Sequence, residues 1–320
     1  WLAGHLASGD RVAADPRLHS ARWYRDAAAT LASAGVELIA VAENPVDVCW
    51  LDRPQALRRP ALLLSEELTG ESSHEKRQRI GAAVAAQGGD AALIFPPDSI
   101  SWLLNVRGTD VPRMPVLQSL AVLERDGGLS LLVDDRRIPA GFEAHAGPGV
   151  TVLEPAEAAA VLTRLSDKRV LVDPGTCNAW CEQVLEAAGC RLVTAGDPVL
   201  LPKACKNPVE LAGARAAHIR DGAAKTRFLA WLDGEVAANR LPDEAALADA
   251  LYAIRREDER FRDLSFDTIS AAGANAAMCH YNHNDAGSAP LTMDSVYLVD
   301  SGAHYLDGTT DITRTVAIGD

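Results

Sequence analysis

The sequence has no long apolar run, no excess of positive charge and no repeat or low-complexity tract. None of its apolar stretches approaches the ~18 consecutive residues that a membrane-spanning helix needs. Its 44 acidic residues outnumber its 31 basic residues, for a formal net charge of −13 at pH 7. This balance disfavours nucleic acid and anionic membranes as partners, because phosphate binding needs a basic patch.

Cysteine is also scarce, with six residues in 320. Cys177 and Cys181 stand four apart, but no second close pair completes a zinc knuckle, and a chain of this length does not need a disulfide scaffold. We expect free, mostly buried thiols in a reducing compartment, the cytoplasm. The chain begins with Trp1, and no basic region followed by an apolar core opens it. We therefore expect a processed or missing N-terminus, which leaves a lost targeting segment open.

Alternating strand and helix patterns predict an α/β (α+β) fold of three domains. Residues 1–57 hold one strand–helix–strand unit, too little for an independent core, so they are expected to be part of a first domain. A second α/β domain is predicted at 58–200, and a third begins at 201. The expected elements of the second domain are helices at 72–87, 155–165 and 178–188 and strands at 91–95, 117–124, 129–133, 169–172 and 191–193.

The third domain opens with the clearest helix signal of the chain. Asn207 is a natural N-cap, Pro208 suits the first turn, and Glu210 completes a variant of the capping box. We expect this helix to continue to about Val236 and a second helix to span about 244–256. The remainder is rich in Gly, Thr and Asp and has a strand-like pattern.

The stretch from Ser295 to Asp320 carries the chemistry. An apolar strand is predicted at 296–299, ending directly before Asp300, and a second strand at 309–316 follows the turn residues Asp307-Gly308. Alternation places one set of polar side chains of the second strand on a single face. These are Thr309, Asp311, Thr313 and Thr315.

Two interpretations of these carboxylates remain open from the residues alone. Asp300, Asp307 and Asp311 are either solvated turn and edge residues, or two of them converge on a cation, since close carboxylates repel unless a positive charge neutralises them. A two-residue turn at Asp307-Gly308 would pair Asp300 with Thr315. Pairing Asp300 with Asp311 needs a turn centred near residues 305–306, or a bulge.

The stretch Val-Asp-Ser-Gly-Ala-x-Tyr-x-Asp-Gly-Thr-Thr-Asp-Ile-Thr-Arg-Thr, residues 299–315, resembles the metal-binding signature of the long, three-domain Xaa-Pro aminopeptidases, which belong to the pita-bread metallopeptidase family M24B. Asp300 and Asp311 match the family's two aspartates, eleven residues apart. His280, twenty residues before Asp300, matches its substrate-side histidine. Segments 50–54, 102–108 and 206–222 resemble further parts of the same family.

This resemblance implies two creatinase-like N-terminal α/β domains followed by the first half of a pita-bread catalytic domain. It implies two divalent ions of the manganese type, with Asp300 on one ion and Asp311 bridging both. A hydroxide shared by the ions would attack the peptide carbonyl before proline, and His280 would stabilise the oxyanion. Substrates would be peptides with proline in second position. Members of the family are often dimers, although no residue here indicates one.

The family's remaining metal ligands, one His and two Glu, have no counterpart in these 320 residues, so we expect this polypeptide to be inactive by itself. His283 and His304 match no ligand; His283 is expected in a loop near the cleft. Two other functions remain open: a prolidase-like dipeptidase, and a non-catalytic binding module on the same fold. Oxygen and imidazole ligands admit Mn, Co or Zn, so the residues do not identify the metal.

Overall fold

The computed structural model describes residues 1–55 and 58–319, in two compact units. Unit 1 consists of Trp1–Leu63, Glu71–Val111 and Pro115–Cys205. Unit 2 consists of Leu64–Gly70, Pro112–Met114 and Lys206–Asp320. The predicted boundary between residues 57 and 58 falls at the edge of the undescribed pair, so it lies outside the described residues.

The amino-terminal part of unit 1 contains the expected strand–helix–strand unit. β1 (Arg11–Ala14) pairs in parallel with β2 (Glu37–Ala40), and α2 (Ala21–Ser33) joins them. Ser20 caps α2 by accepting a hydrogen bond from the backbone N–H of Trp23. Two short helices flank this unit, α1 (Leu2–His5) and α3 (Pro45–Cys49).

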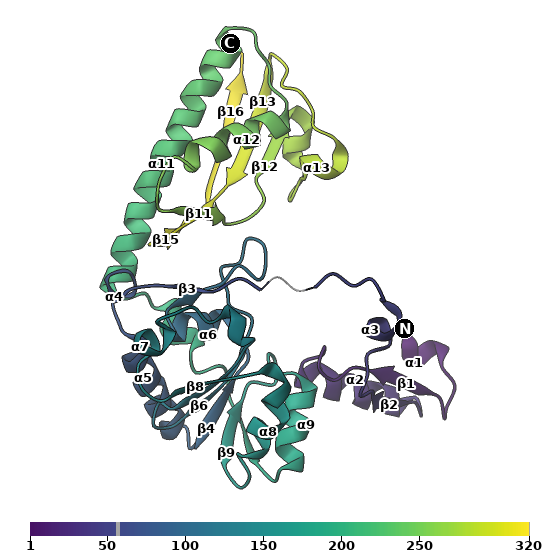
Figure 1. Ribbon diagram of the computed structural model, residues 1–320. Coiled ribbons are helices and arrows are strands. Elements are labelled where there is room, and N and C mark those ends of the chain that lie inside the picture. The colour runs from purple at the N-terminus through teal and green to yellow at the C-terminus, as the bar shows by residue number, and fades with distance from the viewer. Residues whose placement is uncertain (56–57, 320) are drawn as a thin grey trace. The chain divides into compact units, whose positions relative to one another are not determined.

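The rest of unit 1 is built on a six-stranded sheet, in the order β10-β9-β4-β6-β7-β8 (Figure 1). Its strands are β4 (Ala91–Ile94), β6 (Leu120–Glu124), β7 (Leu129–Leu132), β8 (Val150–Leu153), β9 (Arg169–Val172) and β10 (Arg191–Thr194). β6 and β7 form the predicted hairpin, with Gly127 at a positive φ of 85°. A separate two-stranded ladder joins β3 (Leu62–Leu63) to β5 (Val106–Arg107).

Helices cover both faces of this sheet, because alternate residues of β4 enter two different cores. Ala92 and Ile94 pack in the core that includes α5 (Ser73–Ala86), α6 (Pro97–Leu103) and α7 (Phe142–Ala146). Ala91 and Leu93 pack against α8 (Ala158–Thr163) and α9 (Ala179–Ala187). The layered α/β arrangement predicted for this segment is therefore observed. α10 (Leu200–Ala204) ends the unit.

Unit 2 is organised by the long helix α11 (Pro208–Ala237). The predicted capping box is present: Asn207 Oδ1 accepts from the N–H groups of Val209 and Glu210, both at 2.9 Å, and Glu210 accepts from the N–H of Asn207 at 2.9 Å. α12 (Glu244–Arg255) follows, capped by Asp243. The unit also includes the short α4 (Glu66–Thr69).

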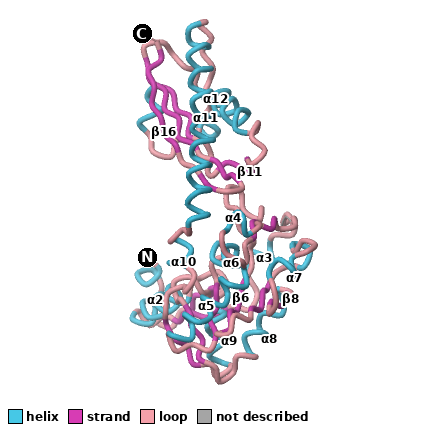
Figure 2. Tube along the Cα trace, turned by 90° about the vertical axis from the view of Figure 1, so that its left-hand side faces the viewer, coloured by secondary structure: helices cyan, strands magenta, loops and turns pink. Residues whose placement is uncertain are grey.

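Two antiparallel sheets complete unit 2 (Figures 1 and 2). The first has the order β12 (Ile269–Ala272), β13 (Ser295–Ser301), β16 (Ile312–Ile318). The second has the order β11 (Phe261–Leu264), β14 (Ala303–Tyr305), β15 (Gly308–Thr309). α11 and α12 cover the face of the first sheet that carries Tyr297 and Val299, and both side chains are fully buried there.

Among the described residues, no helix combines the length and the apolar character needed to cross a membrane. All six cysteines are free thiols. Cys177 and Cys181 are buried, but Cys49, Cys205 and Cys279 are exposed, so the expectation of mostly buried thiols is wrong for three of them.

Candidate functional site

The carboxylates singled out in the sequence lie on one hairpin. Its register differs from both of the turns considered from the sequence. Asp300 pairs with Thr313, and Tyr305 pairs with Gly308, so the turn consists of Leu306 and Asp307. β13 continues through Asp300 to Ser301 instead of ending before Asp300 as predicted. The predicted second strand is interrupted at residues 310–311, between β15 and β16.

Packing against α11 explains why the turn forms there. A Cβ atom on Gly213 would lie 2.3 Å from the carbonyl oxygen of Asp307, and one on Gly308 would lie 2.9 Å from the Cβ of Ala217. The Asp307 carboxylate accepts hydrogen bonds from Arg220 at 2.9 and 3.0 Å and from Arg260 at 2.8 Å. Asp307 is thus a buried structural residue, not a solvated one.

The register places Asp300 and Asp311 on the same face of the sheet. Tyr297, Val299 and Ser301 point into the core, so Asp300 points to the opposite face. Continued beyond β16, the register sets Asp311 opposite residue 302, diagonal to Asp300; such neighbours have Cα atoms about 7–8 Å apart. This separation is compatible with two carboxylate ligands on either side of a shared cation.

The electrostatic surroundings of the two carboxylates fit cation binding. Asp300 is half-buried and accepts one hydrogen bond, at 2.7 Å from the Thr313 hydroxyl; Asp311 is exposed. Within the described ranges, no basic side chain forms an ion pair with either. Two hard oxygen donors on one face with no basic partner are suited to a divalent cation such as Mn²⁺.

Behind these carboxylates, on the inward face, lies a buried polar cluster that sequence reasoning missed. Asp221 and Lys225 come from α11, Arg255 from α12, and Ser301 and Thr310 from the hairpin. Arg255 makes a two-pronged ion pair with Asp221, at 2.7 and 2.9 Å. A usable signal was present in the sequence, since residues 217, 221, 224, 225, 228 and 232 form one helical stripe that includes two charges.

Burial is the largest single influence on the pKa values of Lys225 and Asp221 in this cluster. Burial and, after it, the neighbouring Arg255 guanidinium lower the pKa of Lys225 to about 7, against the opposing effect of the Asp221 and Asp300 charges. Burial alone would raise the pKa of Asp221, but Arg255 and the hydroxyls of Thr310 and Tyr305 bring it below its usual range. The Asp221 carboxylate therefore remains charged at neutral pH.

His280 lies in the loop that follows β12, the strand paired with β13. Its side chain is exposed, and its φ of 56° is uncommon for a non-glycine residue. No hydrogen bond or ion pair between described residues joins it to Asp300 or Asp311. The structure thus brings the two aspartates to one face and places His280 on a neighbouring strand connection.

A second buried carboxylate holds the His280 loop. Glu244 accepts hydrogen bonds from the N–H of Ala272 at 2.7 Å and of Ala289 at 3.0 Å. It also accepts from Asn275 at 2.9 Å and from the Tyr281 hydroxyl at 2.8 Å. Burial opposes its charge, but these four donors lower the pKa of Glu244 overall. Both ends of the loop are therefore fixed to the start of α12.

The other two histidines near the signature, His283 and His304, have structural surroundings. His304 is hydrogen-bonded through both ring nitrogens, to the Thr309 hydroxyl at 2.9 Å and to the Arg113 carbonyl at 3.0 Å, which agrees with its not being a ligand. His283 was expected in a loop, but it is the first residue of the short helix α13 (His283–Ala286) and is buried. Its Nδ1 has no hydrogen-bond partner among the described residues.

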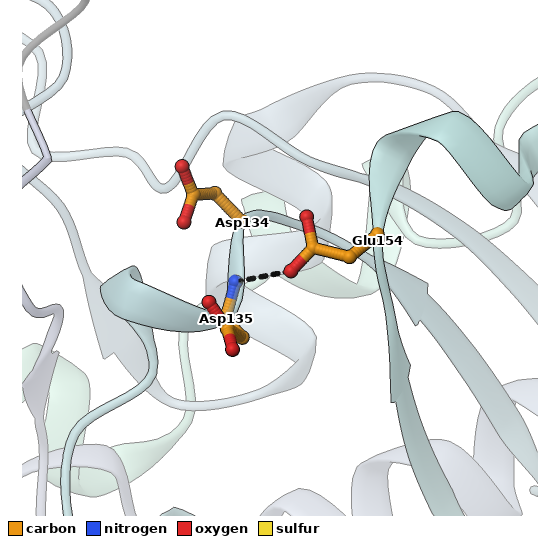
Figure 3. Close-up of side chains that lie close together, drawn as sticks. All are labelled: Asp134, Asp135 and Glu154. Atoms are coloured by element: carbon orange, nitrogen blue, oxygen red, sulfur yellow. Dashed lines mark hydrogen bonds between the residues drawn. The ribbon is translucent and has the colours of Figure 1, made fainter.

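Unit 1 contains a separate acidic group (Figure 3). Ligand atoms of Asp134, Asp135 and Glu154 lie within 4.8 Å of one another. Asp134 is bound by Arg136 at 2.8 Å and by Arg58 at 3.1 Å, and Glu154 accepts from the N–H of Asp135 at 3.2 Å. The Arg136 guanidinium holds the pKa of Asp134 below its usual range. Arginine side chains and a backbone N–H therefore already bind carboxylates of this group.

Comparisons with known proteins agree with the two-part organisation. The family model "Creatinase/Prolidase N-terminal domain" matches residues 52–210, and "Metallopeptidase family M24" matches residues 212–320. A probable Xaa-Pro aminopeptidase P of Leptosphaeria maculans is 35% identical over 99% of this chain and 54% of its own length. One of Talaromyces stipitatus is 36% identical over 98% of this chain and 49% of its own length. The chain spans about half the length of these curated relatives.

Solved structures give the same result. The X-prolyl aminopeptidase of Caenorhabditis elegans, described as a cytosolic enzyme with a di-nuclear active site, superposes with a TM-score of 0.91 at 30% identity, over 100% of this chain and 53% of its own. An Xaa-Pro dipeptidase of Bacillus anthracis shares the fold, with a TM-score of 0.60 at 19% identity over 78% of this chain and 66% of its own. The expected architecture, creatinase-type α/β followed by pita-bread elements, is confirmed, and residues 212–320 belong to the metallopeptidase family M24.

Proposed function

We propose that the whole protein is a metal-dependent aminopeptidase that releases the N-terminal residue from peptides with proline in second position. The observation that carries the proposal is the register of the β13–β16 ladder, which, continued to Asp311 directly before β16, sets Asp300 and Asp311 on one face, without an ion-pair partner among the described residues. Similarity to Xaa-Pro aminopeptidases along the whole of this chain supports the substrate class.

In this proposal Asp300 and Asp311 hold two divalent ions, manganese being the expected metal. When bound, such ions lower the pKa of water and stabilise negative charge on a carbonyl oxygen. Asp300 keeps one carboxylate oxygen oriented by the Thr313 hydroxyl. In the same proposal His280, on its anchored loop, would donate a hydrogen bond to the substrate carbonyl oxygen as charge develops there.

The domain division proposed for the chain is 1–57, 58–200 and 201–320, with the peptidase segment last. A cytoplasmic location is part of the proposal, since the similar nematode protein is described as cytosolic. A homodimer is compatible with it, although no contact in the chain indicates one.

A prolidase-like dipeptidase is the second candidate, because its fold is shared at lower similarity. Substrate length separates the two. We expect the whole protein, loaded with Mn²⁺, to release arginine from Arg-Pro-Pro at least about tenfold faster than it cleaves a free Xaa-Pro dipeptide, measured by mass spectrometry. A preference for the dipeptide would favour the prolidase-like function. Loss of both activities, with the fold intact by circular dichroism, would favour a binding module.

The polypeptide of residues 1–320 serves as the matched comparison for this assay. We expect it not to release arginine from Arg-Pro-Pro, because two carboxylates are too few ligands for a dinuclear centre. Turnover by this polypeptide, purified to homogeneity and sensitive to a chelator, would contradict the assignment of further ligands outside it.

A further inference from the structure

The buried polar cluster lies directly behind the two proposed metal ligands. Ser301 follows Asp300 in the chain, and Thr310 precedes Asp311. Both side chains point inward and are fully or almost fully buried, at 0% and 1% exposure. Because neighbouring residues in extended chain point to opposite faces, fixing these two side chains also fixes the direction of the aspartates beside them.

Each of the two inward side chains is bound by charged groups. The Ser301 hydroxyl accepts from Lys225 Nζ at 2.7 Å and from Arg255 Nη2 at 3.1 Å. The Thr310 hydroxyl donates to Asp221 Oδ2 at 2.7 Å and accepts from the N–H of Ala303 at 3.0 Å. One hydroxyl thus connects both strands of the hairpin to the α11 carboxylate.

Asp221 and Arg255 join these contacts into one network. Arg255 pairs with Asp221 and reaches Ser301, while the Tyr305 hydroxyl donates to Asp221 Oδ1 at 3.0 Å. A buried ion pair adds little stability relative to well-packed apolar residues, and its best-attested use is to specify one arrangement over its alternatives. The local sequence admits more than one turn for this hairpin, so contacts of this kind are needed to select the observed register.

Resting on the proposed function above, we propose that Asp221 and Thr310 are positioning residues that hold Asp300 and Asp311 in the geometry that binds metal. Loss of the Thr310 hydroxyl frees the segment that carries Asp311 from Asp221 while leaving the apolar packing of the hairpin nearly unchanged. The carboxylates then bind the cation with a higher entropic cost, because they are no longer preorganised.

The test uses two substitutions at one position. Thr310→Val preserves the shape and removes the hydroxyl, and Thr310→Ser keeps the hydroxyl and removes a methyl group. Thr226→Val is the matched control, because Thr226 is exposed on α11 and its hydroxyl only bonds to the Gly222 carbonyl. The dissociation constant of Mn²⁺ is measured by electron paramagnetic resonance for the whole protein, and the melting temperature of each variant is measured beside it.

We expect Thr310→Val to weaken Mn²⁺ binding about 10–100-fold, the usual effect of losing a residue that orients a metal ligand. Thr310→Ser should restore binding to within about threefold of the unmodified protein, and Thr226→Val should not change it. In the whole protein, Thr310→Val should lower kcat with little change in KM.

Three results would overturn the inference, and they can be told apart. Equal Mn²⁺ affinity for Thr310→Val and the unmodified protein removes the positioning role and leaves the metal site and the proposed function standing. Absence of Mn²⁺ binding by the unmodified whole protein removes the proposed function and the positioning role together. Weaker binding in Thr310→Ser than in Thr310→Val would assign Thr310 to packing alone.

Discussion

Two groups of acidic side chains, one in each unit, show that closeness of carboxylates is a poor guide to a metal site. Ligand atoms of Asp134, Asp135 and Glu154 lie within 4.8 Å of one another, yet Arg58 and Arg136 already bind the Asp134 carboxylate, and a backbone N–H donates to Glu154. Asp300 and Asp311 are only two carboxylates, and Asp300 accepts its hydrogen bond from a neutral hydroxyl, that of Thr313.

The difference lies in what neutralises each group. An exposed carboxylate beside an arginine gains little from a further cation, because its charge is already compensated and solvated. Two carboxylates on one face with no basic partner repel each other until a cation binds. The surroundings of the oxygens, more than their number, therefore distinguish the two groups.

Removing charge from both groups gives the largest expected contrast. In the whole protein, Asp300→Asn together with Asp311→Asn should lower kcat/KM by roughly 10³-fold or more, since bound metal contributes several kcal/mol to charge stabilisation. Asp134→Asn together with Glu154→Gln should leave kcat/KM within about twofold. Steady-state kinetics on Arg-Pro-Pro with saturating Mn²⁺ decides this. Equal losses for the two pairs would mean that the comparison is wrong.

An intermediate effect is expected at Glu244, a buried carboxylate with only neutral donors. Its folded-state pKa lies below its unfolded value, about 4.3, so the stability it contributes is complete above that value and is lost as pH falls through the folded pKa. Glu244→Gln should cost about 1–3 kcal/mol at pH 7, because it places an amide N–H₂ among donors. It should also flatten the decline of unfolding free energy between pH 5 and pH 3.

The free energy of unfolding of residues 1–320 is measured at each pH by urea titration, with the NMR amide signals of Tyr281 and Ala289 as the probes. Tyr281→Phe, which removes one donor and no charge, is the matched control and should keep most of the pH dependence. A pH profile that Glu244→Gln leaves unchanged would show that the carboxylate does not stabilise the loop.

The smallest effect is expected in the acidic group of unit 1. Arg136→Ala should lower the free energy of unfolding only slightly, because the Arg136 side chain is mostly exposed and its ion pair with Asp134 is screened by solvent. The loss should shrink further in 1 M salt, where the Debye length is about 3 Å. A larger or salt-independent loss, measured by urea denaturation, would show that this pair contributes more than its exposure indicates.

The helix boundaries were largely predictable because their signals are local. The capping box at Asn207 and the Gly127 turn depend on residues within a few positions of one another, and both are present as expected. The hairpin register was not predictable, because the contact that selects its turn joins Gly213 to Asp307, 94 positions apart. The two carboxylates were identified by the resemblance of residues 299–315 to a family signature, whereas the buried cluster behind them was not identified.

Local sequence by itself determined the longer helices and the main strands of the sheet in unit 1, and the signature at 299–315 pointed to a metal-dependent peptidase. Only the tertiary structure decided that Asp300 pairs with Thr313, that Asp307 is structural, and that Asp221 and Glu244 lie buried beneath the hairpin and the His280 loop. The physical reason is that burial and the pairing of charges depend on contacts between distant segments, which no local pattern encodes.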